Sequence, residues 1–372
     1  MTMRIGIDAH AAEKPGEGNC TYIRNFLLAL ADLDETNEYV LYATDAGHPF
    51  YARFAGRPNY RVHELAAKNP MVRIPFDLAR ASRRDKIDIL HVQYIAPFRH
   101  HGKLIATIHD LGFLHRPQFF SKFFVFRSKW LVRMSARRAA RIITGSEYSR
   151  NDIVQSYGLD DGCVVVVPYG VSPAFRPDQD PGAVAGVLEK YGIREPYLLC
   201  VGRLNPRKNL ATLVKAFGLL KDGENLRHSL VVAGKADPDL PAVEGETALS
   251  RKRGVVFTGF IPDEDLPLLY AGADVFIYPS LFEGVGLPVL EAMASGVPVV
   301  TSDTTSLRET AGDAALTVDP LDVGRMAEAI SRLARDTDLR RLLCHRGLER
   351  ASEFTWKKTA ERTLEVYRSV FR

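Results

Sequence analysis

The chain has 372 residues, with 49 Lys and Arg against 45 Asp and Glu, and therefore a formal net charge of +4. Because a single hydrophobic core stops growing at about 250–300 residues, this length predicts two domains. The composition, with 46% hydrophobic and 25% charged residues, is that of a globular protein and excludes long disordered, collagenous or coiled-coil structure.

The N-terminal segment and the cysteines indicate a cytoplasmic protein. The chain begins with a strand-like segment, 4–8, and lacks the charged and then apolar stretch of a signal peptide. No apolar run approaches the roughly 18 residues that span a bilayer. Cys20, Cys163, Cys200 and Cys344 lie far apart and form no metal or disulfide pattern, so we expect a reducing compartment.

Short runs rich in β-branched residues alternate with helical patterns, such as 21–33 and 209–220, along the whole chain. Several of the runs are almost continuously apolar, which is typical of strands buried on both faces. The alternation predicts α/β domains with doubly wound parallel sheets. The expected strands are 4–8, 38–43, 87–93, 103–108, 141–145, 163–168, 197–202, 229–234, 254–259, 274–279, 297–301 and 314–318.

A stretch punctuated by Pro and Gly, residues 168–196, marks the expected domain boundary, because a strand and a helix restart at Tyr197. We place the domains at 1–175 and 176–354, each with one Rossmann-like unit. Residues 1–175 carry 23 basic and 17 acidic side chains, a net charge of +6, whereas the remainder carries 26 and 28, a net charge of −2.

Residues 116–141 combine eight basic side chains with six aromatic ones and contain no acidic residue. A basic helix with interleaved aromatics suits an anionic membrane surface. The alternative is a helix whose aromatic side chains pack on their own sheet while its cations are solvated. The sequence leaves both open, and no motif supports nucleic-acid binding.

Arg203 and Lys208 follow the strand that opens the second domain. The carboxyl end of such a strand faces the ligand crevice of a doubly wound sheet. Arg presents a planar fork to phosphate and Lys a point charge, so the pair predicts a site for a diphosphate.

The most informative stretch is 278–302, in which a strand runs into the loop Glu283-Gly284-Val285-Gly286 and then into a helix that starts near Pro288. Such a helix start directs backbone N–H groups and the positive end of the helix dipole at an anion. Glu283 and Glu291 flank this start, and carboxylates accept hydrogen bonds from hydroxyl-rich ligands.

Together these segments resemble the retaining, nucleotide-sugar-dependent glycosyltransferases of the GT-B fold, group 1 (glycosyltransferase family 4). Glu283-x7-Glu291 resembles the paired-glutamate signature of that family, and 202–210 its diphosphate-binding segment. The family's base-contacting turn and its active-site His-Asp segment resemble 256–261 and 107–111. The resemblance covers about residues 4–371.

The resemblance implies two Rossmann-like domains that face one another across a crevice, with the helix 355–372 crossing back onto the first. It implies that Glu283 holds sugar hydroxyls, that Glu291 holds the ribose, and that Arg203 and Lys208 stabilise the leaving diphosphate. Further donor-binding residues would be Gly18, Gly202, Gly259, Phe260, Ile261, Gly284, Val285, Gly286, Leu287, Pro288 and Val289.

The acceptor side is expected in the first domain. His109, at the end of the 103–108 strand, corresponds to a family histidine beside the reaction centre and would orient the sugar or the acceptor. His91 and Gln93 also end a strand, and with Asp110 they are the expected lining of the acceptor pocket. Arg207 is expected to be a bystander.

The expected reaction is the transfer of a hexosyl unit, with retention, to a hydroxyl of a glycan or lipid-linked acceptor during cell-surface polysaccharide or glycolipid assembly. We expect no metal or other cofactor, because no Asp-x-Asp pair closes a buried strand beside the Glu/Arg/Lys set. Family members with a loop similar to 282–288 often use GDP-mannose, so the resemblance implies that donor, with UDP- and dTDP-sugars open. The rivals are a nucleotide-sugar 2-epimerase and a non-catalytic binding module.

Overall fold

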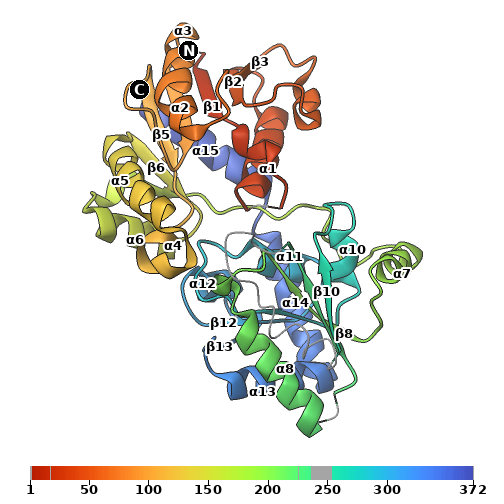
Figure 1. Ribbon diagram of the computed structural model, residues 1–372. Helices are drawn as coiled ribbons and strands as arrows, with labels where there is room; N and C mark the ends of the chain where they lie inside the picture. Colours follow the sequence, from red (N-terminus) through yellow and green to blue (C-terminus); the bar gives the residue numbers. More distant parts are fainter. Residues whose placement is uncertain (1, 17, 225, 236–253, 372) are drawn as a thin grey trace. The chain divides into compact units, whose positions relative to one another are not determined.

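The computed structural model describes residues 2–16, 18–224, 226–235 and 254–371. The chain forms two compact units, residues 1–170 with 356–372 and residues 171–355. Each unit is built on one parallel sheet with helices packed against it (Figure 1). The first unit ends after Gly170, a few residues before the position expected from the Pro and Gly pattern.

The first unit contains a seven-stranded sheet in the order β3-β2-β1-β4-β5-β6-β7. Its strands are β1 (Arg4–Asp8), β2 (Glu38–Ala43), β3 (Tyr60–Glu64), β4 (Ile89–Gln93), β5 (Lys103–Thr107), β6 (Arg141–Thr144) and β7 (Val164–Val166). Its helices are η1 (His10–Glu13), α1 (Gly18–Leu33), η2 (Pro49–Phe54), α2 (Pro70–Val72), the π-helix η3 (Arg73–Leu78), α3 (Ala79–Arg84), α4 (Gly112–His115), η4 (Pro117–Phe119), α5 (Lys122–Arg138), α6 (Glu147–Tyr157), η5 (Asp161–Cys163) and α15 (Trp356–Phe371).

The second unit contains a six-stranded sheet in the order β10-β9-β8-β11-β12-β13. Its strands are β8 (Tyr197–Val201), β9 (Ser229–Ala233), β10 (Val255–Gly259), β11 (Val275–Tyr278), β12 (Val299–Ser302) and β13 (Ala315–Val318). Its helices are α7 (Pro181–Lys190), η6 (Pro206–Lys208), α8 (Leu210–Glu224), α10 (Leu266–Ala271), α11 (Leu287–Ala294), α12 (Ser306–Ala311), α13 (Val323–Arg335) and α14 (Thr337–Ser352).

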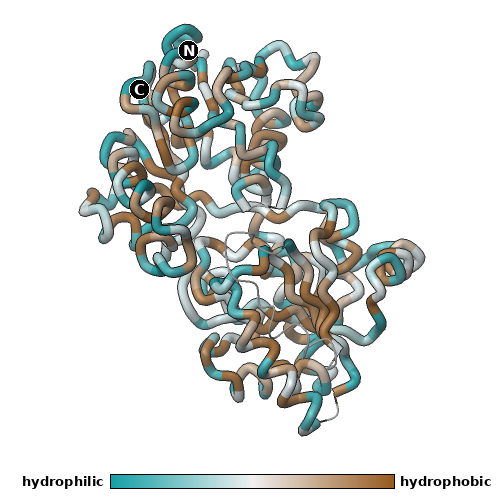
Figure 2. Tube along the Cα trace, in the orientation of Figure 1, coloured by the Kyte–Doolittle hydropathy of each residue, from teal (hydrophilic) through white to brown (hydrophobic). Residues whose placement is uncertain are grey.

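Apolar strands of the second sheet are covered on both faces, as their composition predicts. Leu198 packs in a core with Phe217 of α8, whereas its neighbour Leu199 packs in the opposite core with Val289 of α11. Successive side chains of a strand point to opposite faces, so a strand between two helix layers must be apolar throughout. These strands form the brown band in the lower part of Figure 2.

The strand β3 was not among the expected ones. Its sequence, Tyr-Arg-Val-His-Glu, alternates polar with apolar residues, and only Tyr60 is buried. It occupies the edge of the sheet beside β2, where one side of the backbone has no strand neighbour. A half-exposed edge strand needs no continuous apolar run, so the pattern that found the others missed it.

The C-terminal helix α15 belongs to the first unit, where it packs against α1 (Figure 1). Tyr367 Oη contacts His91 Nδ1 at 2.6 Å, and Lys103 Nζ donates to the Val370 carbonyl at 2.6 Å. The buried residues of this helix include Leu364 and Tyr367. Among the described residues, no helix is both long and apolar enough to cross a membrane.

Candidate functional site

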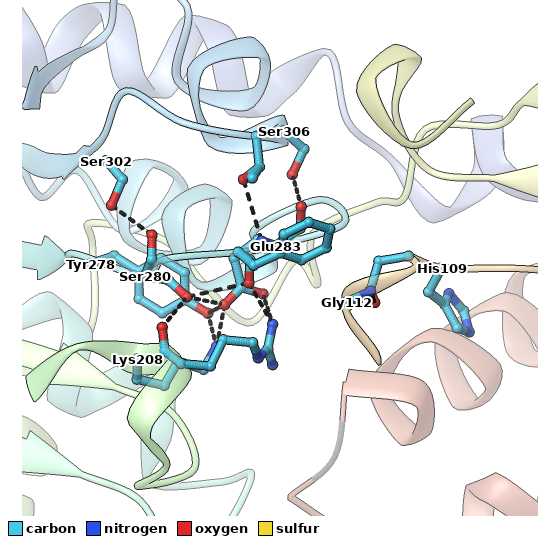
Figure 3. Close-up of polar contacts among 12 residues, drawn as sticks. His109, Gly112, Lys208, Tyr278, Ser280, Glu283, Ser302 and Ser306 are labelled. Atoms are coloured by element: carbon cyan, nitrogen blue, oxygen red, sulfur yellow. Dashed lines mark hydrogen bonds and ion pairs between the residues drawn. The ribbon is translucent and has the colours of Figure 1, made fainter. Parts of the chain in front are cut away.

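The carboxyl ends of β8 and β11 lie next to each other in the second unit, because the two strands pair in parallel. The turn η6 with Lys208 follows β8, and the loop with Glu283 follows β11. Parallel strands deliver the residues after their carboxyl ends to one edge of the sheet. The sequence-predicted Lys208 and Glu283 therefore meet at that edge (Figure 3).

Glu283 is a buried carboxylate surrounded by donors. Its Oε1 accepts from Lys208 Nζ at 2.6 Å, Ser280 Oγ at 2.6 Å and Tyr278 Oη at 3.1 Å, and its Oε2 lies 3.0 Å from Arg207 Nη1. Burial alone would raise the pKa of Glu283, but Arg207 and Lys208 lower it to about 2. The group is therefore an ionised hydrogen-bond acceptor at neutral pH and not a proton donor.

Lys208 is buried with its Nζ 4.6 Å from the centre of the Tyr278 ring, and it also donates to the Tyr278 hydroxyl. Burial lowers the pKa of Lys208, and the Glu283 carboxylate acts in the opposite direction. The neighbouring Gly202 has φ 148°, and a Cβ there would lie 3.2 Å from Lys208 Cε. The backbone at Gly202 thus leaves room for the lysine stem.

Arg207 was expected to be a bystander, and that expectation is wrong. Besides the Glu283 carboxylate, its Nη1 donates to the Phe282 carbonyl at 2.7 Å. The arginine therefore fixes both the side chain and the backbone of the Glu283 loop. The sequence signal for Arg207 was its position directly before Lys208, after the strand. Arg203, the arginine assigned to the phosphate, is exposed.

Hydrogen bonds from α12 hold the loop Glu283–Gly286 in place. Ser306 Oγ donates to the Glu283 carbonyl at 2.8 Å, and Thr310 donates to the Val285 carbonyl. Gly286 has φ 89°, and a Cβ at this position would lie 2.5 Å from Leu307 Cδ2. Only glycine fits both the backbone angle and the space, so the start of α11, with Leu287, Pro288 and Val289 in its first turn, is rigidly placed.

Glu291 lies on α11, where Tyr270 donates to its Oε2 at 3.0 Å. Burial raises the pKa of Glu291 to about 7, and Asp263 adds to the rise while Tyr270 opposes it. The two glutamates of the signature thus differ in charge state. Glu283 is held ionised by cations, whereas Glu291 is about half protonated at neutral pH. A ligand that donates a hydrogen bond to Glu291 would shift it toward the ionised form.

The remaining donor-side residues follow β8 and β10, which flank β9 in the sheet. Gly234 N–H, at the end of β9, donates to the Gly259 carbonyl at 2.8 Å, so the ends of these strands share one edge. Gly259 has φ 72°, the Phe260 side chain is exposed, and Ile261 is buried.

In the first unit, His109 follows β5 and is buried among aromatic rings. Its Nδ1 lies 2.6 Å from Tyr169 Oη and its Nε2 lies 3.0 Å from Gln93 Oε1. The rings of Tyr22 and Tyr94 meet the imidazole edge-on at 4.9 and 5.4 Å. Burial lowers the pKa of His109 to about 3, so it is neutral and acts as a positioned hydrogen-bonding group.

His91 does not have the position expected of an acceptor ligand. It is 2% exposed, and its two ring nitrogens bond to Tyr367 Oη at 2.6 Å and Thr107 Oγ1 at 2.7 Å. His91 and Gln93 are two residues apart and therefore lie on the same face of β4, but His91 is buried against Tyr367 of α15, whereas Gln93, at the end of the strand, is only partly buried. His91 therefore joins α15 to the sheet.

Gln93, Asp110 and Gly18 are the other residues predicted in this unit. Gln93 Nε2 is buried and has no hydrogen-bond partner among the described residues. Asp110 Oδ1 accepts from the Gly112 N–H at 2.8 Å, which fixes the turn after His109 (Figure 3). Gly18 is exposed at the start of α1 with open space where a side chain would be, and Glu17 before it lies outside the described residues.

The aromatic side chains of α5 are largely on the surface. Phe123 is 66%, Phe126 78% and Trp130 62% exposed. The alternative that the aromatics of 116–141 fill their own core is therefore wrong for these three. Phe124 is also exposed, at 37%, although its ring packs against Phe113 and Phe120.

Within the described parts of the chain, no cluster of three or more His, Cys, Asp or Glu side chains has the arrangement of a metal site. The Asp237/Asp239 pair lies outside the described residues.

Comparisons with known proteins agree with this geometry. Residues 20–175 match the family described as "Glycosyltransferase Family 4", and residues 195–336 match "Glycosyl transferases group 1". The O-antigen chain mannosyltransferase B of Escherichia coli is 35% identical over 271 residues, which are 72% of this chain and 70% of that protein.

Two solved structures share the whole fold. The sucrose-phosphate synthase of Thermosynechococcus elongatus superposes with a TM-score of 0.79 at 22% identity over 99% of both chains. Anabaena Alr3699/HepE in complex with UDP and glucose has a TM-score of 0.74 at 17% identity, over 99% of this chain and 100% of its own. These likenesses, with the two parallel-sheet units, identify the GT-B fold. The two family matches and the E. coli relative show that this chain is a glycosyltransferase that belongs to glycosyltransferase family 4, the group 1 glycosyl transferases.

Proposed function

We propose that this enzyme moves a hexosyl unit from a nucleoside diphosphate sugar to a hydroxyl of a glycan or lipid-linked acceptor, with retention of anomeric configuration, in polysaccharide or glycolipid assembly at the cytoplasmic face of a membrane. GDP-mannose is the first candidate donor. The name of the E. coli relative, a mannosyltransferase, supports the sugar. UDP-sugars are the competing donors, because the Anabaena neighbour is described with UDP and glucose.

The observation that carries the proposal is the clamped Glu283. Burying the Glu283 carboxylate together with Arg207 and Lys208 costs free energy, because the charges must be taken out of water. We therefore infer that the buried carboxylate has a functional role. Its oxygens are oriented by four side chains before any ligand arrives. Such an acceptor suits the hydroxyls of a sugar ring, which donate hydrogen bonds in a fixed pattern.

Lys208, Arg203 and the start of α11 would then hold the diphosphate. Two cations and a helix N-terminus stabilise the negative charge that develops on the leaving phosphate, which is the role a metal ion has in other transferases. We therefore propose metal-independent chemistry. No side chain in this edge of the sheet is placed as a covalent nucleophile in the described residues, and we propose a front-face reaction assisted by the departing phosphate.

A direct test measures thermal stabilisation by GDP, UDP, dTDP and their sugars, since ligand binding raises apparent stability by mass action. Preferential stabilisation by GDP and GDP-mannose would support the proposed donor, and preference for another base would replace it. Glu283→Gln and Lys208→Ala should lose this stabilisation, whereas Lys215→Ala, an exposed lysine on α8, should keep it. Wild-type binding in the first two variants would contradict the site.

Reaction outcome and metal dependence need separate measurements. Proton NMR of the glycoside product distinguishes a retained from an inverted anomeric bond. Full activity in excess chelator supports the metal-independent mechanism, and activity restored only by Mg²⁺ or Mn²⁺ overturns it. Donor turnover without any acceptor, with epimerised sugar as product, would favour the 2-epimerase alternative.

The exposed aromatic face of α5 supports a peripheral membrane contact. Phe123, Phe126 and Trp130 protrude beside the basic side chains of a helix that has no acidic residue. Aromatic side chains enter the interface of a bilayer, and Lys and Arg are attracted by anionic headgroups. We propose that α5 rests on an anionic membrane, which would bring the enzyme to a lipid-linked acceptor.

A further inference from the structure

Arg73 is a buried cation in the first unit, and it has no role in the candidate site described above. It is 4% exposed and opens the π-helix η3. Its Nε has no hydrogen-bond partner, and its guanidinium forms no ion pair, among the described residues. A buried arginine whose Nε–H has no hydrogen-bond partner is rare, because each unsatisfied buried polar group costs free energy.

The segment that carries Arg73 is held firmly in this shape. Asn69 caps α2 by accepting from the Met71 N–H at 2.9 Å, and Asp77 accepts from the Ala67 N–H at 2.6 Å. Pro75 has no N–H to donate and its ring would clash inside an α-helix, which explains the wider π-helical turn. Such turns are uncommon and frequently occur at functional sites.

Burial in this segment is the reverse of what apolar packing would produce. Met71 is 49%, Val72 44% and Phe76 66% exposed, while the arginine between them is directed inward. Packing of apolar side chains therefore does not account for the position of Arg73.

Arg73 lies near Asp8, the last residue of β1. Burial would raise the pKa of Asp8, but His10 and Arg73 hold it below its ordinary value. Asp8 Oδ1 is bonded to His10 Nδ1 at 2.7 Å, whereas no direct ion pair joins Asp8 to Arg73 in the described residues. A purely structural counter-ion would bond directly to the carboxylate. Arg73 instead keeps its planar set of donors for another oxyanion.

A second unsatisfied donor belongs to the same edge of the sheet. Ile7 of β1 pairs with His91 of β4, so the residues after Asp8 lie beside Gln93. Gln93 Nε2 is also buried without a partner in the described residues. The start of η3 and the end of β4 thus each present a buried donor that no described acceptor satisfies.

We propose that Arg73 is the centre of an oxyanion subsite in the first unit, and that the acceptor carries a negatively charged group, a phosphate or a carboxylate, which Arg73 binds. The assignment of this anion to the acceptor rests on the proposed transferase function. The guanidinium offers two parallel N–H groups to a planar or tetrahedral oxyanion, a geometry that Lys does not reproduce. Arg73 is in this view a specificity residue.

The test uses the full chain with inorganic phosphate and with D-glucuronate as probes, titrated by calorimetry at constant ionic strength. Saturating nucleoside diphosphate fills the donor site, so that the probe does not report on Lys208. The variants are Arg73→Gln and Arg73→Lys, and Arg80→Gln is the matched control because Arg80 is an exposed cation on the adjacent helix.

We expect wild type and Arg80→Gln to bind a probe alike, Arg73→Gln to bind it at least about tenfold more weakly, and Arg73→Lys to fall between them. Binding of phosphate alone identifies a phosphate-bearing acceptor, and binding of glucuronate alone identifies an acidic sugar. Equal binding by wild type and Arg73→Gln, or no binding of either probe by wild type, overturns the subsite. If circular dichroism shows that Arg73→Gln is unfolded, the comparison of wild type with Arg73→Lys decides in the same way.

The two proposals fail separately. A wild-type protein that binds no nucleotide sugar refutes the proposed function, while an Arg73-dependent phosphate affinity measured without nucleotide would still stand. Conversely, suppose that the wild-type protein binds and turns over a nucleotide sugar and that the Arg73 variants bind both probes as wild type does. That result refutes only the subsite.

Discussion

The pKa of Glu291 leads to a prediction about the stability of the second unit. Burial raises this pKa to about 7 from the 4.5 of an exposed glutamate. The folded chain therefore holds the Glu291 proton more tightly than the unfolded chain does. Its stabilising effect is complete below pH 4.5 and is lost as the pH rises through 7.

Replacement by Gln keeps an acceptor for the Tyr270 hydroxyl but removes the titration. A shift of 2.5 pKa units, from 4.5 to about 7, corresponds to about 3.4 kcal/mol at 1.36 kcal/mol per unit. Because the side chain is only partly buried, solvent reduces this figure, and we expect about 1–3 kcal/mol. Glu291→Gln should match wild type near pH 4.5 and exceed its free energy of unfolding by this amount near pH 8.5.

Urea unfolding followed by circular dichroism at the two pH values measures the difference. Glu264→Gln is the control, since Glu264 is exposed in the loop before α10 and should show no pH-dependent gain. A gain for Glu291→Gln that is the same at both pH values would refute the reasoning. The same proton also opposes donor binding, so the affinity of wild type for nucleoside diphosphate should fall as the pH drops from 8 to 5.5.

Three further predictions concern the clamp, the loop and the surface. Arg207→Met should reduce kcat/KM about tenfold or more, because Glu283 loses one of its two cations, and unchanged kinetics would contradict the clamp. Gly286→Ala should lower the free energy of unfolding by about 1–3 kcal/mol, because φ is 89° and the new Cβ meets Leu307; a neutral effect in thermal unfolding would show that the loop relaxes. Phe126→Ser should weaken sedimentation with anionic vesicles without changing donor binding, and equal sedimentation of the variant and wild type would remove α5 as the membrane contact.

Much of the site was accessible from residue order alone. Glu283, Gly286 and Glu291 follow a strand that continuous apolar residues identify, and Lys208 follows another. Parallel sheets bring such strand ends to one edge whatever the details of packing, so the meeting of Lys208 with Glu283 follows from the pattern.

Other features depend on side-chain directions that a sequence does not specify. His91 and Gln93 lie near the end of the same strand and looked equivalent, yet His91 is bonded to Tyr367 of α15, 276 positions later in the chain. Arg207 and Arg203 are four residues apart in one turn. Arg207, within the 3₁₀ turn η6, reaches Glu283, whereas Arg203, which lies before that turn, is exposed.

The sequence by itself determined two α/β domains, the edge of each sheet that bears the polar residues, and the family of the chain, because strand composition and motif order survive without coordinates. Only the tertiary structure decided the charge states of the paired glutamates and the exposure of the α5 aromatics. The overall charge of +4 indicated neither the ionised, doubly paired Glu283 nor the isolated Arg73. The physical reason is that burial and neighbouring charges set the pKa of a side chain, and neighbouring acceptors decide whether its donors are hydrogen-bonded. Burial and neighbours both arise only when distant segments of the chain pack together.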